Sequence, residues 1–278
     1  GPCLEQLTAL QAAPYSLLAV SSACAALTAR NIPIDLCIST DAGYWVLQHF
    51  DKLPAEVPVA FPLEAAVPIS ILRTHPCIPL SYNSPLETVL FTTANLQPLS
   101  ARENGTVTGT ACELLLQHTD RTIILAGVDL AAAKGFTHAQ PHASIARLFT
   151  ASDRLHPLAG ALAVQNFAVQ SLETYRQWFL QLPPEAARRL FRVGIGGAPL
   201  PNIKSVDLTA AVTERPQDAA RFSVEPTSVP SGQERTRIAL SLLNTLYTEI
   251  PALITAEPIP MIAMRRMMPL SNSSLMPV

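Results

Sequence analysis

The chain has 278 residues, of which 49% are hydrophobic and 14% charged, and its formal net charge is −2. Such a length and balance fit one large globular domain with a sizeable core, or a domain with an appendage. The near-neutral charge and the lack of basic runs argue against nucleic acid as the main partner. Residues 7–29 are uncharged, but Pro14 and several polar residues interrupt them, so no membrane span is expected.

The chain carries five cysteines, an odd number without a C-x-x-C pair. We expect them to be small hydrophobic residues in a reducing cytoplasm. The start of the chain lacks the basic segment that opens a signal peptide. The sequence therefore predicts a cytoplasmic protein.

Helices and strands alternate in the first part of the chain. We predict a helix over 4–12, a strand over 15–20, a helix over 23–30 and a strand over 34–40. This rhythm is typical of a parallel sheet with right-handed crossovers. Eight prolines between residues 51 and 100 favour short strands, edges and loops over long helices. Short strands are predicted there over 57–62, 69–72 and 77–81.

The second half continues the pattern less regularly. A small, hydroxyl-rich loop opens a helix that ends near His118, and an apolar strand follows over 123–129. Further along we predict an amphipathic helix, a strand with a glycine turn, a polar linker, a second helix and an appended tail. Their ranges are 171–181, 191–200, 205–232, 231–250 and the last 25 residues. The predicted domains are 1–204 and 205–278.

The predicted fold class is α/β, with a mostly parallel, Rossmann-like or sialyltransferase-like sheet, helices on both faces and a C-terminal helical extension. Parallel strands end at one edge, where ligands of open α/β sheets bind. Several polar residues fall at predicted strand ends or at the helix start after them, so we expect them to converge. They are Ser21, Asp41, Asn104, Gly105, Thr106, Thr108, Gly127 and Asp129.

The loop before the predicted helix at 107 is the most informative of these segments. Asn104-Gly105 by itself is typical of a plain turn, but Thr106, Thr108 and neighbouring small residues follow where the helix begins. Free backbone N–H groups at a helix start bind anions such as phosphate, so we favour ligand binding there. Asp41 and Asp129 remain open between ligand contact and helix capping.

His138 is the best candidate acid or base, because it lies in a loop beyond a predicted strand and an imidazole titrates near neutral pH. His142 lies four residues on, a spacing that can hold a metal on a helix. Pro141 between them makes a continuous helix, and hence a metal site, the less favoured alternative.

An ordered set of motifs resembles one known family. Gly1-Pro2-Cys3-Leu4 is followed by Ser39-Thr-Asp41, Gly105-Thr-Val-Thr-Gly-Thr-Ala111, Gly127-Val-Asp129-Leu130 and Thr137-His138-Ala139. The later segments Thr174-Tyr-Arg-Gln-Trp-Phe179 and Ile195-Gly-Gly-Ala198 extend the set. Together they resemble the bacterial motility accessory factors, proposed flagellin glycosyltransferases, which share a domain with archaeal 6-hydroxymethylpterin diphosphokinases. The family usually has Ser where this chain has Cys3.

The resemblance implies transfer of a CMP-activated nonulosonic acid to a Ser or Thr hydroxyl of flagellin. It implies that Gly1, Pro2 and Cys3 with the 104–110 segment hold the nucleotide phosphate, and that Asp41 and Asp129 bind hydroxyls or a metal. His138 would take the proton from the attacking hydroxyl. No cofactor is firmly predicted, although Mg²⁺ is possible. The alternatives are an ATP- and Mg²⁺-dependent pterin diphosphokinase and a degenerate member that binds without turnover.

Overall fold

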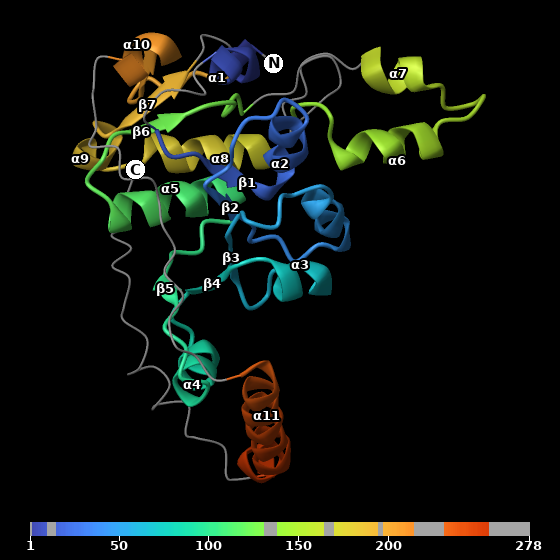
Figure 1. Ribbon diagram of the computed structural model, residues 1–278, viewed down its shortest axis with the longest axis vertical. Coiled ribbons are helices and arrows are strands. Elements are labelled where there is room, and N and C mark those ends of the chain that lie inside the picture. The colour runs from blue at the N-terminus through green and yellow to red at the C-terminus, as the bar shows by residue number, and fades with distance from the viewer. Residues whose placement is uncertain are drawn as a thin grey trace, which may run out of the picture. The chain divides into compact units, whose positions relative to one another are not determined.

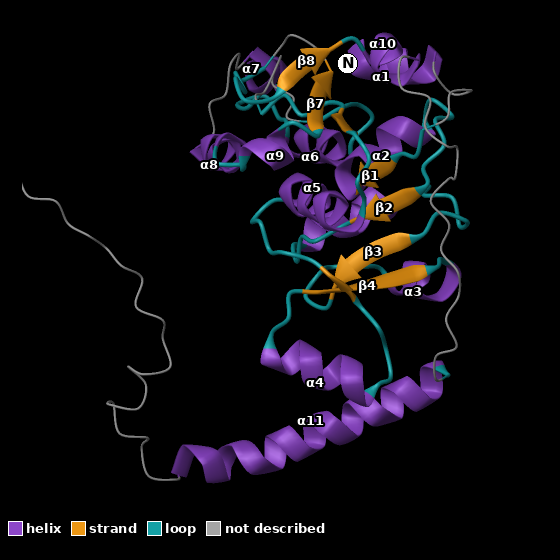
Figure 2. Cartoon of the chain, turned by 90° about the vertical axis from the view of Figure 1, so that its left-hand side faces the viewer, coloured by secondary structure: helices purple, strands orange, loops and turns teal. Residues whose placement is uncertain are grey.

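Five parallel strands form the main sheet of the computed structural model (Figure 1). The described residues are 2–9, 15–130, 138–163, 170–193, 197–213 and 231–255. The strands pair in chain order, which Figure 2 shows most clearly for the first four. They are β1 (Leu18–Val20), β2 (Leu36–Ile38), β3 (Val59–Pro62), β4 (Cys77–Ser81) and β5 (Leu99–Ser100). The strands predicted over 15–20, 34–40, 57–62 and 77–81 are thus confirmed, with shorter bounds.

Helical crossovers connect these strands, because a parallel pair cannot be joined by a hairpin. The connections are α2 (Ser21–Thr28), the 3-10 helix η1 (Tyr44–Phe50), α3 (Ile69–Thr74) and α4 (Pro85–Thr93). The strand predicted over 69–72 is wrong, since α3 occupies that range. Four residues are too few for their hydrophobic period to separate a strand from a helix. The parallel pairing of β3 with β4 decides for the helix.

Helix α4 begins on one of the prolines of 51–100 and is short, with nine residues. Pro85 stands at its first position, where a missing N–H costs nothing. Ser84 and Glu87 form a reciprocal capping box: the Glu87 N–H donates to Ser84 Oγ over 3.3 Å, and the Ser84 N–H donates to Glu87 Oε2 over 2.9 Å. The sequence Ser84-Pro-Leu-Glu87 held this signal.

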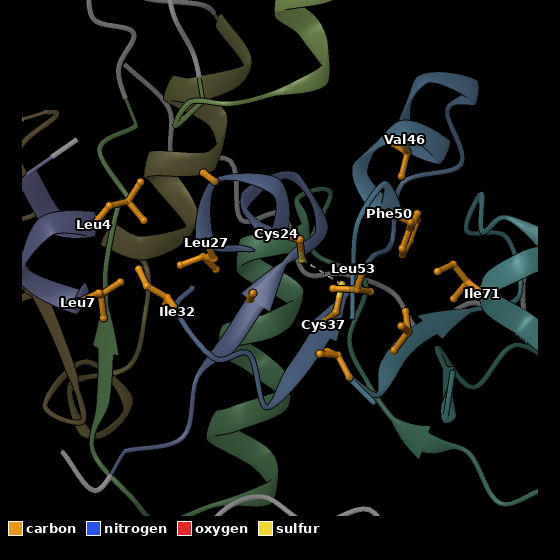
Figure 3. Packing of buried hydrophobic residues seen from close by; sticks show 14 of the residues in the cluster. Leu4, Leu7, Cys24, Leu27, Ile32, Cys37, Val46, Phe50, Leu53 and Ile71 are labelled. Atoms are coloured by element: carbon orange, nitrogen blue, oxygen red, sulfur yellow. Dashed lines mark hydrogen bonds between the residues drawn. The ribbon is translucent and has the colours of Figure 1, made fainter. Parts of the chain in front are cut away.

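The two faces of the main sheet bury different helices. Along β2, Leu36 and Ile38 face one cluster, and Cys37 between them faces the other, as expected for a period of two. Cys37 packs on Cys24 of α2, with the two sulfurs 3.5 Å apart (Figure 3). On the opposite face, α5 (Val107–His118) packs with Ala111 and Leu114. Helices therefore cover both faces, as predicted.

A second ladder of three parallel strands follows in the chain. Its members are β6 (Ile123–Leu125), β7 (Leu190–Val193) and β8 (Lys204–Val206). Cys112 of α5 packs against Ile123, so α5 contacts the cores of both ladders. The helix predicted over 171–181 is confirmed as α8. The intervening helices are α6 (Ala143–Ala151), α7 (Leu158–Ala163), α8 (Gln170–Leu180) and α9 (Pro184–Ala187).

The fold differs from prediction after residue 204 and at the beginning of the chain. Residues 205–206 end β8 and residues 208–213 form α10 (Leu208–Thr213), where a linker was predicted. The rest of the predicted linker, 214–230, lies outside the described residues. Helix α1 (Pro2–Ala9) begins two residues earlier than expected. It packs against α10, and its Leu4 and Leu7 join the core of the main sheet (Figure 3).

The chain divides into two compact units, 1–88 with 97–228 and 89–96 with 229–278. The second contains α11 (Gly232–Thr255), which confirms the helix predicted over 231–250. The predicted tail falls mostly on 256–278, outside the described residues. The domain division after residue 204 stays a prediction. Within the described ranges, no helix combines the length and apolar character needed to cross a bilayer.

Candidate functional site

The carboxyl ends of β1 and β2 carry two of the predicted site residues. Strand β1 ends at Val20, and α2 begins at the next residue, Ser21, without an intervening loop. Asp41 follows the end of β2 by three residues. Because Val20 pairs in register with Ile38, both chain segments leave the sheet at the same edge.

The Asp41 carboxylate has a structural contact of its own. Its Oδ1 accepts the Gly43 N–H over 2.7 Å, which turns the chain into η1, whereas the carbonyl of Asp41 accepts the Ala66 N–H over 2.9 Å. The residue is exposed. One oxygen therefore stabilises the turn before η1 but does not cap η1, whose N-cap Gly43 has no side-chain cap hydrogen bond. The exposed side chain still faces solvent at this edge.

Three imidazoles gather beside Ser21. His49 lies on η1, and its Nδ1 is 3.2 Å from the Ser21 hydroxyl oxygen. The His49 ring centroid is 5.0 Å from that of His142, which in turn stacks on His138 with centroids 4.2 Å apart and planes 5° apart. The structure thus brings His138 to the edge where Ser21 lies, and adds His49 and His142. We refer to His49, His138 and His142 as the histidine cluster.

Sequence reasoning missed the role of His49 in this arrangement. Its only local signal is its position in η1 between Val46 and Phe50. These two buried residues determine which side of η1 packs on the core. The contact of His49 with His142 spans more than ninety positions of sequence, and no local pattern reports it.

Electrostatics keep the histidine cluster uncharged near neutral pH. Burial, and then repulsion from His138 and His49, lowers the pKa of His142 to about 4. Burial lowers the pKa of His49, and repulsion from His138 adds to this, whereas Asp41 opposes it. Partial burial of the His138 ring lowers the pKa of His138, because it disfavours the charged form. Neutral imidazoles can accept protons.

The stacking also bears on the metal alternative for His138 and His142. In parallel rings the in-plane nitrogen lone pairs run side by side and do not converge on a point between the rings. Within the part of the chain that the structure describes, no group of three or more His, Cys, Asp or Glu side chains has the geometry to hold a metal ion.

The start of α5 lies at the same edge as Asp41. The hydroxyl of Tyr82, which follows β4, lies near those of Thr40 and Thr110, so the ends of β2 and β4 lie close to the beginning of α5. Burial, and then repulsion from Glu64, raises the pKa of Tyr82. This contact joins three chain segments that the sequence predicted separately.

Local geometry around α5 satisfies part of its free backbone. Thr106 caps the helix by accepting the Gly109 N–H over 3.3 Å, and Gly105 turns the chain with φ of +71°. Thr108 is half-buried. The buried Oδ1 of Asn104 packs so closely on Gly109 that a Cβ there would come within 1.8 Å of it, and this oxygen has no hydrogen-bond partner among the described residues.

Asp129 and Gly127 lie after β6, in the second ladder rather than in the main sheet as predicted. Gly127 has φ of +76°, in the left-handed region that favours glycine. Asp129 Oδ1 is 3.8 Å from Arg192 Nη2, and its carbonyl accepts the Ala198 N–H over 2.8 Å. Hydrogen bonding between β6 and β7 sets these contacts, so Asp129 is held beside β7.

The predicted loop at the beginning of the chain is described only in part. Gly1 lies outside the described residues, whereas Pro2 and Cys3 form the first turn of α1. The helix therefore starts directly after the glycine. Whether these residues contact a nucleotide stays a prediction.

The fold and this edge define an α/β protein with a five-stranded parallel sheet, helices on both faces and a polar carboxyl edge. Two curated sequences are similar to the chain. An uncharacterized protein of Treponema pallidum (strain Nichols) is 42% identical over 203 residues, covering 73% of this chain and 45% of that protein. A second uncharacterized protein of the same strain is 29% identical over 177 residues, or 60% of this chain and 30% of the relative.

The chain thus spans less than half the length of these relatives. No protein-family model matches the sequence, and no solved structure matches it.

Proposed function

We propose that the chain is a glycosyltransferase of the motility accessory factor type, which transfers a CMP-activated nonulosonic acid to a Ser or Thr hydroxyl of flagellin. The observation that carries the proposal is the histidine cluster beside Ser21 at the carboxyl edge of a parallel sheet. Ligands of open α/β sheets bind at such an edge. The ordered motifs described above resemble that family and supply the substrate class.

In this proposal His138 acts as the general base. It is exposed, so an acceptor hydroxyl can reach it, and its lowered pKa leaves it neutral at pH 7. The acceptor oxygen forms a bond to the anomeric carbon while its proton passes to His138. The bond from that carbon to the phosphate oxygen breaks, and CMP leaves with the electron pair. Positioning and charge stabilisation supply most of the rate, because CMP is a good leaving group.

The pterin diphosphokinase alternative has less support. It needs carboxylates that share a magnesium ion, and Asp41 and Asp129 are the two that the sequence offers. Asp41 Oδ1 is bonded to the Gly43 N–H, and Asp129 pairs with Arg192 in the other ladder. The contacts of these two carboxylates therefore favour separate roles.

The test measures transfer and binding separately. The chain is incubated with a CMP-nonulosonic acid and purified flagellin, and intact mass spectrometry follows the flagellin. We expect a mass increase by one sugar per modified site, no increase with His138→Ala, and an unchanged rate with His156→Ala, which alters an exposed histidine between α6 and α7. Thermal shifts with CMP and with ATP plus Mg²⁺ accompany the assay. Stabilisation by ATP and Mg²⁺ alone would refute the proposal in favour of the kinase, and CMP binding without transfer would favour a non-catalytic member.

A further inference from the structure

The beginning of α2 has free donors at the sheet edge. Its N-cap residue is Val20, which has an extended backbone and no side-chain oxygen, so no side chain caps the helix. The N–H groups of a first helical turn have no partner inside the helix. In α2 these belong to Ser21 and the residues after it, directly at the end of β1. A helix start alone does not make a site, but two further observations concern the same place.

The first is a buried hydroxyl. Ser39 is fully buried, and its Oγ has no hydrogen-bond partner among the residues that the structure describes. A buried polar group without a partner costs on the order of 1–3 kcal/mol. The Ser39 hydroxyl can therefore donate to and accept from a further partner without giving up a hydrogen bond.

The register of the sheet places Ser39 beside the start of α2. Cys37 lies on the α2 face of β2 and contacts Cys24, and Ser39 is two residues further along the same face. Helix α2 runs away from this edge, so Ser21, one turn before Cys24, lies at the level of Ser39. The Ser39 hydroxyl therefore lies on the α2 face of the sheet, at the level of the first turn of α2.

The second observation is His49. It reaches the same turn from η1 through the Ser21 hydroxyl. The titratable groups that face His49 are His138 and His142 from the segment 138–142, and Asp41 from the loop after β2. The histidine cluster therefore has three imidazoles near a single carboxylate, that of Asp41. Proton uptake by the histidine cluster would give the surroundings of Ser21 a net positive charge.

We propose that the first turn of α2, the Ser39 hydroxyl and His49 together form a subsite for one tetrahedral oxyanion, the phosphate of a nucleotide. Donors from three elements suit a group that presents several acceptor oxygens. The identity of the biological ligand rests on the proposed function, whereas the subsite itself is defined by anion chemistry. It lies on the α2 face of the sheet, separate from the α5 start to which the motifs assign the phosphate.

Binding at this subsite takes up a proton. The free protein holds His49 neutral, because burial lowers its pKa. A bound oxyanion beside the ring favours imidazolium and raises that pKa. The bound state therefore holds more protons than the free state. Affinity for the anion increases as the pH falls from the raised pKa of His49 in the complex toward its lowered pKa in the free protein.

Sulfate is the probe of choice, since its charge stays constant between about pH 5.5 and pH 8. We expect histidine NMR resonances, those of His49 among them, to titrate with sulfate, and the affinity to be about tenfold higher at the acid end. A tenfold change corresponds to about 1.4 kcal/mol. Absence of any sulfate-dependent shift at either pH would overturn the subsite.

Two substitutions test the assignment. Ser39→Ala removes a buried hydroxyl without a partner among the described residues, so the free protein should keep or gain stability while the sulfate affinity falls about tenfold. His49→Gln should abolish the pH dependence of binding. Ser241→Ala on α11 and His118→Gln at the end of α5 are matched controls that should bind as the unaltered chain does. Unchanged affinity in Ser39→Ala would overturn the subsite.

The same titrations with CMP separate the two proposals. Sulfate binding without CMP binding would support the subsite and refute the CMP-sugar function. CMP binding that Ser39→Ala leaves unchanged would support the function and overturn the subsite.

Discussion

The lowered pKa of His142 predicts that the free energy of unfolding decreases as the pH falls. An unfolded chain leaves this imidazole near its ordinary pKa of 6.5, whereas the folded protein lowers the value to about 4. As the pH falls below 6.5 the unfolded state therefore binds a proton that the folded state does not. The stabilising contribution is present above pH 6.5 and is lost between 6.5 and about 4.

The magnitude follows from the two values. Between about pH 7 and pH 5 the differential protonation of His142 should remove about 2 kcal/mol from the free energy of unfolding. The assay is urea denaturation of the unaltered chain, of His142→Gln and of His118→Gln at both pH values. Gln does not titrate, so His142→Gln should lose about 2 kcal/mol less on acidification than the unaltered chain.

His118 supplies the control because its ring is exposed and bonds to the Ser100 carbonyl over 3.0 Å. His118→Gln should keep the full acid sensitivity. If His142→Gln and the unaltered chain lose equal stability between the two pH values, then burial of the stacked imidazoles does not disfavour their charge, and the electrostatic reasoning for the histidine cluster is refuted.

Three further results are expected. Gly109→Ala should lower the free energy of unfolding by about 1–2 kcal/mol, because its Cβ would displace Asn104, whereas Gly160→Ala in α7 meets no close atom and should be neutral or stabilising; urea denaturation of both checks this. Glu87→Ala should cost about 2 kcal/mol, since it removes the acceptor of two backbone N–H groups, and a cost equal to that of Glu87→Gln would contradict this. The proposed transfer to flagellin should be independent of pH above 6.5 and fall only below the lowered pKa of His138; a decline that starts above 6.5 would exclude a neutral His138 as the base.

Buried thiols fit the expectation from cysteine spacing. Cys24, Cys37 and Cys112 are free and buried, and Cys77 is free and exposed. Burial, and then the charge of Glu113, raises the pKa of Cys112 to about 12. These three buried thiols pack as small hydrophobic residues. The cytoplasmic location inferred from the cysteines stays a prediction.

The sequence by itself determined the fold class and the placement of most elements. Apolar runs that end on polar residues mark β1, β2 and β6, and the Thr106 cap with its small neighbours marks the start of α5. These signals are local, because caps, turns and hydrophobic periods involve residues within a few positions of one another. The same local rules failed at α3, where four apolar residues do not define a period.

Only the tertiary structure decided which of these residues meet. Pairing of β6 with β7 holds Asp129 beside Arg192, away from the ladder that carries Asp41. The meeting of His49 with residues 138–142 needs the complete sheet and its crossovers, since nothing within a few residues of either segment encodes the other. The unpartnered Ser39 hydroxyl is likewise visible only when every neighbour is in place, because hydrogen bonding in a core depends on what packs there and not on local sequence.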